Sequence, residues 1–590
     1  MPEEHHPLTL PAALARAAQR FIGRTAYVEG RHMLTWPDMA QQSREIAAGL
    51  IGLGLQRGDR VAICAENSID WVLACQAVSQ AGGIAVLVYF ELKAEEISRQ
   101  VQWPQCRYLI ASPSVLERID EAKTGVEQVI GIGAEPADAI LPFAAIVQRA
   151  TDEARAALHA RSPEPDDVAV IVYTSGTTSG AKGVMLTHRN LLSNANAAQE
   201  AMSFSPDEVT MLVLPLHHAL PFLAAVVLVS VVGAKTVLEN DLRRIRDRLQ
   251  EHSPTIFFGV PALYELMYRN VMARAEAEGR LAKLRRAQKV VGAIKRTTGI
   301  SLAPVVFKQV HKALGGKLKY LVSGGAALNP QTARDFMSLG LPLLQGWGMT
   351  EASPAIAIQR YSHRKFMTTN YYEDHVGSVG TALPGVEVRL IDVPEKDIRV
   401  AVHGEGEVIV RGPNVFVGYW GAEELTREAM LDGWLRTGDL GRIDKDGNIY
   451  LTGRSKYVIV LESGEKVHPD EVETKLQESE LLHDCVILAR AVRDGKTGVG
   501  LVVYPDPEAA QKRVAESGEA LTEASIRAMV QADIDRLCRE IAAYKRVTKV
   551  ELSDEPLPKT PLRKVARGLI RDGYEFNFEK WLASVAEVAD

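Results

Sequence analysis

Apolar and polar positions alternate along the first part of the chain with two different periods. Residues 60–65 (RVAICA) form a short apolar run, Ile69–Gln80 carries apolar residues at helical spacing, and residues 84–89 (IAVLVY) again resemble a strand. The same alternation recurs over residues 168–238 and 256–344. Strands separated by helices in this way are typical of βαβ units. The pattern therefore predicts an α/β fold with parallel sheets.

The pattern becomes strand-rich near residue 405. Residues 405–451 hold short β-rich runs (EVIVRG, VFVGYW, NIYLTG), and Asp446-Gly447 marks a tight turn between two of them. Such runs with a turn of this composition predict an antiparallel, β-rich subdomain. We expect this subdomain to complete a large N-terminal domain of residues 1–453.

The chain changes character again after Gly453. Pro469 and the acidic residues beside it open a helix, since proline and acids favour the first helical turn. Other elements expected here are strands at 459–461, 485–489 and 499–504 and a long helix at 522–543. We therefore expect residues 454–590 to form a small α+β C-terminal domain that is mobile relative to the large one.

The composition is that of an ordinary soluble protein, with 46% apolar and 24% charged residues among 590. The net charge of −6 excludes a globally basic nucleic-acid binder, so no nucleic-acid partner is expected. Five cysteines without a CxxC pair indicate neither a zinc site nor a disulfide framework. They favour a reducing compartment, and the acidic, His-containing start is unlike a signal peptide. These features predict a cytoplasmic location.

Two stretches bear on membrane contact. Residues 220–234 are the longest apolar run, about 15 residues, which is short of the roughly 20 that a membrane span needs. This run predicts a buried helix. Residues 280–319 carry eleven Lys or Arg and no acid, so the rest of the chain carries −6 − 11 = −17. This basic region is either a solvated helix face or a patch for peripheral membrane contact with anionic headgroups.

The strongest local signal for chemistry is the sequence YTSGTTSGAKG at residues 173–183, directly after an apolar strand. A loop rich in glycine and hydroxyl groups presents backbone N–H groups, hydroxyls and one ammonium together, which are the donors that a polyphosphate needs. The spacing is not that of a Walker A loop. The alternative is an ordinary flexible loop.

Three weaker segments could serve the same ligand. QGWGMTE (345–351) offers a ring for a base and a carboxylate for Mg²⁺. WLRTGD (434–439), with GRSK at 453–456, offers a carboxylate and a guanidinium for a sugar. PKTPLRKV (558–565) holds a lysine in a proline-punctuated loop. Taken singly, each segment is explained as well by a structural role as by a role in binding.

The order and spacing of these four segments resemble the superfamily of adenylate-forming enzymes, which contains acyl-CoA synthetases, peptide-synthetase adenylation domains and firefly-type luciferases. The resemblance covers residues 10–575. Further matching stretches are LPLHH (214–218), GVP (259–261), SGGAA (323–327) and residues 404–419.

The resemblance implies a site for ATP and Mg²⁺. Glu351, with Thr174, would coordinate Mg²⁺, and Asp439 would bind the ribose hydroxyls with Arg454 nearby. The residues that would grip the β- and γ-phosphates are Thr174, Ser175, Gly176, Thr177, Thr178 and Lys182. Those that would border the adenine, some of them near the acyl group, are Gly325, Ala326, Ala327, Gln345, Gly346, Trp347, Gly348, Met349 and Thr350.

The resemblance also implies two half-reactions. Lys564 would be the catalytic lysine of the first, in which the acid becomes acyl-AMP, and His218 matches the histidine at the acid-binding mouth. Lys456 would be the hinge about which the small domain turns to present residues 464–469 to CoA. The family motifs are altered at several positions: Ser179 and Ala181 in the phosphate loop, Arg563 before the lysine, and Tyr457 after the hinge.

The sequence indicates the acid substrate less directly than the nucleotide site. No acidic residue stands between His218 and Glu239 to bind an α-ammonium, which disfavours an amino acid. The apolar residues after His218 suit a hydrocarbon, since each buried CH₂ contributes about 0.8 kcal/mol. KLKYLVSGGAAL (317–328) and the basic region before it resemble long-chain fatty acyl-CoA synthetases. We therefore expect an ATP-dependent ligase for a medium- to long-chain fatty acid.

Several alternatives stay open. An aryl acid would also fit an apolar pocket, and the acyl group could pass to a carrier protein instead of CoA. A luciferase-type monooxygenase and a nucleotide sensor without turnover are further readings, although Glu351, Asp439 and Lys564 together disfavour the sensor. The sequence leaves the oligomeric state open, a homodimer included.

Overall fold

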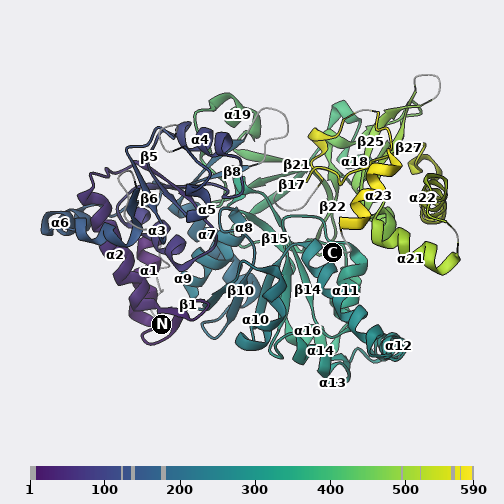
Figure 1. The fold of residues 1–590 in the computed structure, drawn as a ribbon, viewed down its shortest axis with the longest axis horizontal. Helices are drawn as coiled ribbons and strands as arrows, with labels where there is room; N and C mark the ends of the chain where they lie inside the picture. The colour runs from purple at the N-terminus through teal and green to yellow at the C-terminus, as the bar shows by residue number, and fades with distance from the viewer. Residues whose placement is uncertain are drawn as a thin grey trace. The chain divides into compact units, whose positions relative to one another are not determined.

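The computed structural model describes residues 8–120, 124–134, 140–174, 181–492, 496–518, 520–559, 565–571 and 573–587. Within this part of the chain, contacts define two compact units (Figure 1). The first holds residues up to 174, 181–388 and 410–435, and the second holds 389–409 and the residues from 436 onward. The expected domain boundary near Gly453 stays a prediction.

An eight-stranded sheet occupies the N-terminal half of the first unit, in the order β19-β9-β8-β4-β3-β5-β6-β7. The strands from β8 to β7 are parallel, whereas β9 and β19 run antiparallel to their neighbours. The bounds are β3 Arg60–Cys64, β4 Ile84–Leu87, β5 Cys106–Ala111, β6 Gln128–Gly131, β7 Ile140–Pro142, β8 Val168–Thr174, β9 Lys182–Thr187 and β19 Gly418–Tyr419.

A nine-stranded sheet follows, in the order β16-β15-β14-β13-β12-β10-β11-β1-β2. It is parallel from β14 to β1 and antiparallel at both ends. The bounds are β1 Thr25–Glu29, β2 His32–Thr35, β10 Val209–Leu212, β11 Lys235–Leu238, β12 Ile256–Gly259, β13 Tyr320–Ser323, β14 Leu343–Gly348, β15 Ala355–Ile358 and β16 Thr381–Ala382.

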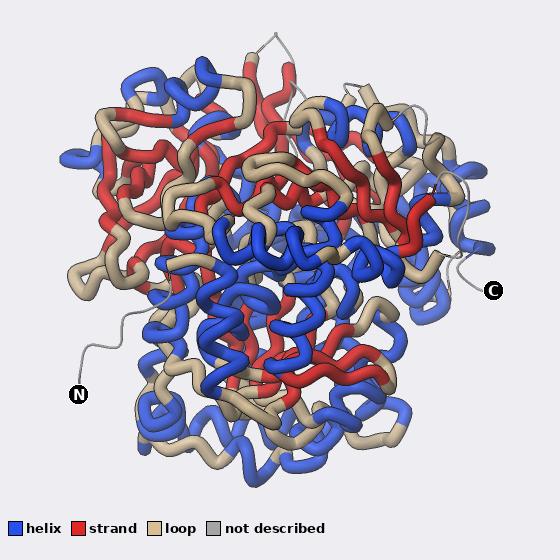
Figure 2. Tube along the Cα trace, turned by 90° about the vertical axis from the view of Figure 1, so that its left-hand side faces the viewer, coloured by secondary structure: helices blue, strands red, loops and turns tan. Residues whose placement is uncertain are grey.

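Helices separate the parallel strands and pack against the sheets (Figure 2). The first half of the unit has α1 Leu10–Arg20, α2 Trp36–Gly52, α3 Ile69–Gln80, α4 Ala94–Gln102, α5 Pro113–Leu116, α6 Asp152–Ala160 and α7 His188–Met202. The second half has α10 Ile245–His252, α11 Pro261–Ala277, α12 Leu281–Thr298, α13 Ala303–Val306, α14 Lys308–Ala313, α15 Pro330–Ser338, α16 His363–Thr368, α17 Tyr371–Asp374 and α19 Glu423–Ala429. The predicted α/β class is confirmed.

The apolar run at 220–234 is buried and helical, as predicted, but it is not one helix. It consists of α8 (Ala219–Phe222), a π-helical turn (Leu223–Val227) and α9 (Leu228–Val232). Pro221 lies in the first turn of α8, where a missing N–H costs no intrahelical hydrogen bond, so proline does not account for the π-helical turn that follows. Among the described residues, no helix combines the length and the apolar character that crossing a bilayer requires.

The β-rich segment forms the five-stranded sheet β17-β18-β21-β20, to which β22 is added beside β21. The predicted turn at Asp446-Gly447 joins β21 and β22, and the Gly447 N–H donates to the Asp444 carbonyl at 3.0 Å. The bounds are β17 Glu387–Ile391, β18 Gly406–Arg411, β20 Met430–Leu431, β21 Trp434–Ile443 and β22 Ile449–Arg454, with α18 at Val400–His403.

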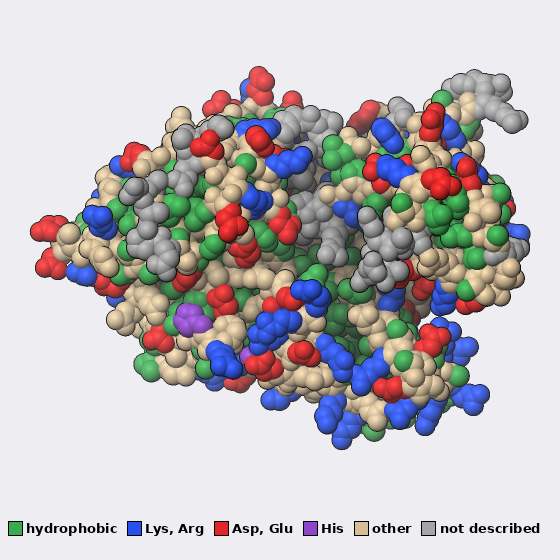
Figure 3. Space-filling view, in the orientation of Figure 1, with side chains coloured by type: hydrophobic (Ala, Val, Ile, Leu, Met, Phe, Trp, Pro, Cys, Tyr) green, Lys and Arg blue, Asp and Glu red, His purple; other side chains and the backbone are tan. Residues whose placement is uncertain are grey.

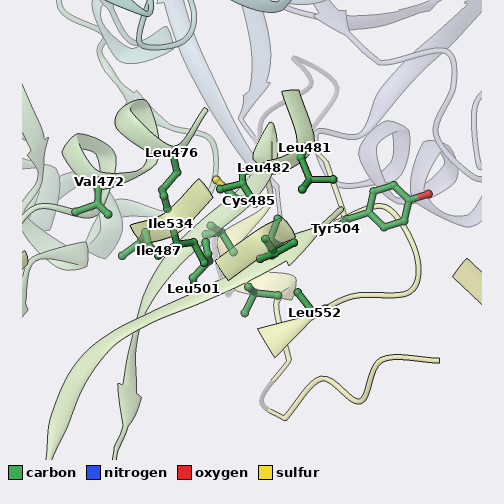
Figure 4. Packing of buried hydrophobic residues seen from close by; sticks show 14 of the residues in the cluster. Val472, Leu476, Leu481, Leu482, Cys485, Ile487, Leu501, Tyr504, Ile534 and Leu552 are labelled. Atoms are coloured by element: carbon green, nitrogen blue, oxygen red, sulfur yellow. The ribbon is translucent and has the colours of Figure 1, made fainter. Parts of the chain in front are cut away.

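The second unit continues with a three-stranded sheet, β25-β26-β27, in which β25 and β26 are antiparallel and β27 is parallel to β26. Its core joins Val472 and Leu476 of α20 to Ile487, Leu501 and Ile534 (Figure 4). The bounds are β23 Ile459–Val460, β24 Lys466–Val467, α20 Pro469–Leu476, β25 Asp484–Ala491, β26 Thr497–Tyr504, α21 Pro507–Ser517, α22 Glu523–Leu537, β27 Lys549–Leu552 and α23 Phe578–Glu587.

Candidate active site

The phosphate-loop candidate joins two antiparallel strands. β8 ends at Thr174 and β9 begins at Lys182, and the two residues stand opposite each other in the ladder. The strand pair therefore brings together the first and last predicted phosphate ligands. The remaining predicted ligands, Ser175, Gly176, Thr177 and Thr178, lie outside the described residues.

A tyrosine connects Lys182 to Glu351. Tyr419 lies on β19, which pairs with β9. The Lys182 ammonium lies 5.0 Å from the centroid of the Tyr419 ring, and the Tyr419 hydroxyl donates to Glu351 Oε1 at 2.7 Å. Burial and the nearby Glu351 carboxylate raise the pKa of Tyr419, so its hydroxyl keeps its proton and remains a donor. Tyr419 thus holds one oxygen of the carboxylate predicted to bind Mg²⁺.

Glu351 fits that role. It lies in a 3₁₀ turn, Thr350–Ala352, and is only 7% exposed. Within the described part of the chain, the hydrogen bond from Tyr419 is the one bond to its side chain. A buried carboxylate with a single donor suits a hard cation, and the Thr174 hydroxyl would supply a second oxygen ligand. Glu351 and Thr174 are the residues that would hold Mg²⁺.

The two segments predicted to border adenine leave adjacent parallel strands. β13 and β14 are neighbours in register, with Ser323 opposite Gln345. Gly325, Ala326 and Ala327 follow β13, and Gly325 adopts φ +78, a conformation that favours glycine. Gly346 and Trp347 belong to β14. In parallel sheets the carboxyl ends of the strands are where ligands bind, so the topology supports one site built from both segments.

The turn after β14 needs a residue without a side chain. A Cβ on Gly348 would lie 1.9 Å from the Pro354 carbonyl oxygen, and that oxygen accepts a hydrogen bond from the Met349 N–H at 2.9 Å. The close approach of the two backbones folds Met349 and Thr350 back toward β15. Glu351 is thereby placed on a fixed turn.

His218 stands in a stack of three rings. Tyr89 and His217 are stacked with centroids 4.4 Å apart, and the His217 and His218 centroids are 4.0 Å apart. Burial lowers the pKa of His218 to about 4 and that of His217 well below its usual range. Both imidazoles are therefore neutral at pH 7. Neither Nε2 atom has a hydrogen-bond partner among the described residues.

The segment that carries His218 is fixed against the SGGAA turn. The Asn67 side chain donates to the Leu214 carbonyl at 3.0 Å and accepts from the Leu216 N–H at 2.8 Å. A Cβ on Gly324 would lie 2.8 Å from Leu220 Cδ2, so the helix start after His218 lies directly on this turn. The structure thus packs Leu220, two residues after the predicted acid-site histidine, against the turn that contains Gly324.

The ribose candidates lie in the second unit. Asp439 on β21 stands opposite Arg454 on β22, and Arg454 Nε lies 3.0 Å from Asp439 Oδ1. Asp439 is buried, while the Arg454 side chain is 46% exposed. The Asp439 N–H donates to the Thr437 hydroxyl, which donates to the Val408 carbonyl. The hairpin therefore holds a carboxylate and a guanidinium in a fixed pair.

Lys564 lies outside the described residues, but the base of its loop is described. Lys559 and Val565 form an antiparallel bridge. Arg567 donates to Asp470 Oδ1 at 2.8 Å and Glu473 Oε2 at 2.6 Å, and its guanidinium lies 5.0 Å from the Tyr457 ring centroid. Tyr457 follows the predicted hinge residue Lys456 in the turn Ser455–Tyr457. Arg567 thus ties the lysine loop to the segment expected to be the hinge.

Sequence reasoning missed Tyr419, His217, Tyr89 and Asn67. Tyr419 ends the matching stretch 404–419 but has no chemical signature of its own. The other three act through residues more than one hundred positions away or through a ring stack. Only the paired histidines at 217–218 offered a signal in the sequence.

Comparison with protein families gives two matches in order along the chain. The model described as AMP-binding enzyme matches residues 14–420, and the model described as AMP-binding enzyme C-terminal domain matches residues 456–585. The chain belongs to the AMP-binding enzyme family. This confirms the predicted membership of the adenylate-forming superfamily. Residues 421–455, which include the predicted ribose ligands Asp439 and Arg454, lie between the two matches.

Curated relatives match over almost their full length. A long-chain-fatty-acid–CoA ligase of Mycobacterium bovis is 28% identical over 92% of this chain and 92% of its own. The peroxisomal long chain acyl-CoA synthetase 7 of Arabidopsis thaliana is 28% identical over 97% of this chain and 85% of its own. A feruloyl-CoA synthase of an Amycolatopsis species is 27% identical over 94% and 97%.

Solved structures share the fold. An anthranilate CoA ligase in complex with anthranoyl-AMP has a TM-score of 0.74 at 22% identity, covering 99% of this chain and 98% of its own. ATP-bound MatB from Rhodopseudomonas palustris has a TM-score of 0.72 at 25% identity, covering 96% and 98%. Both share the fold of this chain, which is an α/β protein with a separate C-terminal domain, as predicted.

Proposed function

We propose that this protein is an AMP-forming acyl-CoA synthetase that activates a medium- to long-chain fatty acid. The observation that carries the proposal is the pair of family matches, large domain and C-terminal domain in order, in a chain nearly as long as its curated relatives. Two of the relatives described above are named for long-chain acids. The chemistry of the described residues supports the same activity.

The first half-reaction needs a bound, polarised triphosphate. The acid's carboxylate attacks the α-phosphorus of ATP, which forms the P–O bond of acyl-AMP and breaks the bond to pyrophosphate. Charge develops on the departing pyrophosphate, so donors fixed in advance are what lower the barrier. Lys182 and the loop after Thr174 would face that charge, and Lys564 would meet the carboxylate and the α-phosphate. Mg²⁺, held by Glu351 and Thr174, would neutralise phosphate charge.

The second half-reaction passes the acyl group to a thiol. The CoA sulfur attacks the carbonyl carbon of acyl-AMP, a C–S bond forms, and AMP leaves with the electrons of the C–O bond. Lys564 is not needed in this step. The proposed hinge at Lys456 would withdraw it and bring the segment before Pro469 to the pantetheine.

Glu239 supports a substrate without an α-ammonium. It is the first acid after His218, and its carboxylate is already engaged. Arg248 Nε lies 2.9 Å from Glu239 Oε2, while the Asn240 and Asp241 N–H groups donate to Oε1 at 3.0 Å each. Hydrogen bonds and nearby arginines lower the pKa of Glu239, which is partly offset by burial. This carboxylate serves the fold rather than the recognition of an amino acid.

The test is acid-dependent exchange of pyrophosphate into ATP, followed by thioester formation with CoA, over straight-chain acids from acetate to stearate and a set of benzoates and cinnamates. We expect exchange and thioester formation to rise with chain length among the fatty acids. Pyrophosphate exchange that does not increase with the alkyl chain length of the acid would overturn the substrate proposal. No acid-dependent exchange at all would overturn the ligase proposal.

An aryl acid is the second candidate, because a feruloyl-CoA synthase matches over 94% of this chain. The same panel distinguishes it: ferulate or a benzoate would then give the highest ratio of kcat to KM. Transfer to a phosphopantetheinyl carrier protein in place of CoA is tested by offering both acceptors to preformed acyl-AMP.

A further inference from the structure

The basic region at residues 280–319 is a packed part of the first unit. It contains α12, α13 and α14, and a cluster of buried residues holds these helices to the end of α15: Val291, Ala303, Phe307 and Leu339. A Lys295–Glu373 ion pair adds to this packing, and the Lys295 ammonium lies 4.3 Å from the Phe366 ring centroid. The surface of the region is therefore fixed by the fold.

Most of its cations serve no visible structural purpose. Of the eleven, Lys295 and Lys319 pair with Glu373 and Glu208, and Arg280 pairs with Glu278. The other eight are exposed, and none forms an ion pair within the part of the chain that the structure describes: Lys283, Arg285, Arg286, Lys289, Arg296, Lys308, Lys312 and Lys317. Arg285, Lys289 and Arg296 share the face of α12 opposite the buried Val291. Figure 3 shows this gathering of Lys and Arg at the lower right, over α12.

Exposed apolar side chains accompany these cations. Eighteen large apolar side chains are exposed among the described residues, and five of them fall within residues 290–306. They are Val290 at 53%, Ile300 at 53%, Leu302 at 41%, Val305 at 79% and Val306 at 49%. Leu302, Val305 and Val306 are spaced as neighbours on one helical face. Exposed apolar groups gathered this closely mark an interaction site.

We propose that this surface, formed by α12–α14 and the residues joining them, docks the protein on an anionic lipid bilayer. The cations face lipid phosphates, to which each Lys or Arg adds attraction within a Debye length, and the apolar side chains enter the boundary between headgroups and acyl chains. A nucleic acid would use the cations but would leave Val305 and its neighbours unpaired. A second copy of the same face would bring two unpaired cationic surfaces together.

The test is co-sedimentation of the full-length protein with vesicles of phosphatidylcholine alone or mixed with phosphatidylglycerol. We expect binding to the mixed vesicles only, weakened by added salt because salt screens the charges. One variant replaces four cations of α12 with glutamine: Arg285, Arg286, Lys289 and Arg296. It should bind at least about tenfold more weakly. A matched control makes the same charge change at four exposed arginines of the same unit: Arg20, Arg31, Arg44 and Arg99.

A second variant, Leu302→Ser with Val305→Ser and Val306→Ser, keeps every charge and should also weaken vesicle binding. Thermal unfolding and acid-dependent exchange of pyrophosphate in vesicle-free solution should match the unsubstituted protein for all variants. Equal vesicle binding by the α12 variant and the control would overturn the proposal. So would binding to duplex DNA in place of vesicles, or a concentration-dependent dimer that the serine variant abolishes. Each of these results is independent of which acid the enzyme activates.

Discussion

At the scale of single residues, the most consequential contact is the one that sequence reasoning missed. Tyr419 touches two predicted ATP-site residues at once, with its ring beside the Lys182 ammonium and its hydroxyl on Glu351. Glu351 has no other side-chain hydrogen bond among the described residues, so within that part of the chain this phenol orients its carboxylate. Removing a partner that orients a metal ligand commonly lowers the affinity for the metal by about 10–100-fold.

Tyr419→Phe tests this contact because it removes the hydroxyl and keeps the ring beside Lys182. We expect the Mg²⁺ concentration needed for half-maximal pyrophosphate exchange to rise by about tenfold or more, with a smaller change in the KM for the acid. Tyr544→Phe removes a hydroxyl from an exposed tyrosine and serves as the control. An unchanged Mg²⁺ titration would show that Tyr419 is only part of the packing.

A buried histidine, His188, leads to a second prediction at the scale of single residues. His188 is 1% exposed, and its Nδ1 accepts from the Leu10 N–H at 3.2 Å. Burial lowers its pKa to about 4, below the ordinary 6.5. A lowered pKa in the folded state means that its stabilising contribution is complete above pH 6.5 and is lost as the pH falls toward 4. At pH 5 the loss is about 2 kcal/mol.

His188→Asn removes the titrating group while an oxygen can still accept from Leu10. We expect the urea midpoint of the large unit to fall less between pH 7 and pH 5 in this variant than in the unsubstituted protein. His159→Asn, at an exposed position, should reproduce the unsubstituted profile. Identical pH profiles for all three proteins would contradict a buried neutral His188.

At the scale of elements, Arg567 is the side chain that ties the base of the Lys564 loop to the neighbouring helix and strand. Arg567 bonds to α20 through Asp470 and Glu473 and to β25 through the Ile487 carbonyl at 2.7 Å. Burial raises the pKa of the Glu473 carboxyl to about 8, against the lowering effect of Arg567. The loop therefore depends on a guanidinium that sits among buried acceptors. The position of this loop should matter most in the first half-reaction, in which Lys564 is expected to reach the substrate.

Arg567→Gln should impair the first half-reaction more than the second. The substitution removes the hydrogen bonds that Arg567 donates to Asp470, Glu473 and the Ile487 carbonyl, and a buried acceptor left without its partner commonly costs about 1–3 kcal/mol. We expect pyrophosphate exchange to fall by more than about tenfold, while thioester formation from supplied acyl-AMP falls less. Arg571→Gln, at an exposed arginine, is the control. Equal losses in both half-reactions would point to a general loss of folding, which thermal unfolding would reveal.

Elements with strong local signals could be predicted from the sequence. The helix at Ile69–Gln80 has the predicted bounds, and Asp446-Gly447 forms the predicted hairpin turn. The run at 220–234 was predicted to be buried, but its division by a π-helical turn depends on packing rather than on composition. The helix expected at 522–543 ends at Leu537, where a 3₁₀ turn begins at Cys538.

At the scale of the whole molecule, the sequence identified the motifs of the site but not the contacts that position them. Motifs with a local chemical signature, such as the strand-to-loop junction at Thr174, could be identified from spacing. The contacts that position them could not, because Tyr419 and Glu351 are 68 residues apart and Asn67 and Leu216 are 149 apart. No periodicity in the sequence encodes such pairings. They follow only from the order of strands in the sheets.

The role proposed for Lys564, which belongs to the second unit, implies that the two half-reactions can be separated by a single substitution. Lys564→Ala removes the ammonium expected to meet the carboxylate and the α-phosphate, and losing one such contact commonly costs about 10²–10³ in rate. We expect acid-dependent pyrophosphate exchange to fall by at least that factor, while thioester formation from supplied acyl-AMP and CoA changes little. Lys559→Ala, in the same loop base but paired with Asp484 at 3.2 Å, is the matched control. If both half-reactions fell equally in the Lys564 variant, its role as the lysine of adenylation would be wrong, because the thiol step breaks a bond that this ammonium does not touch.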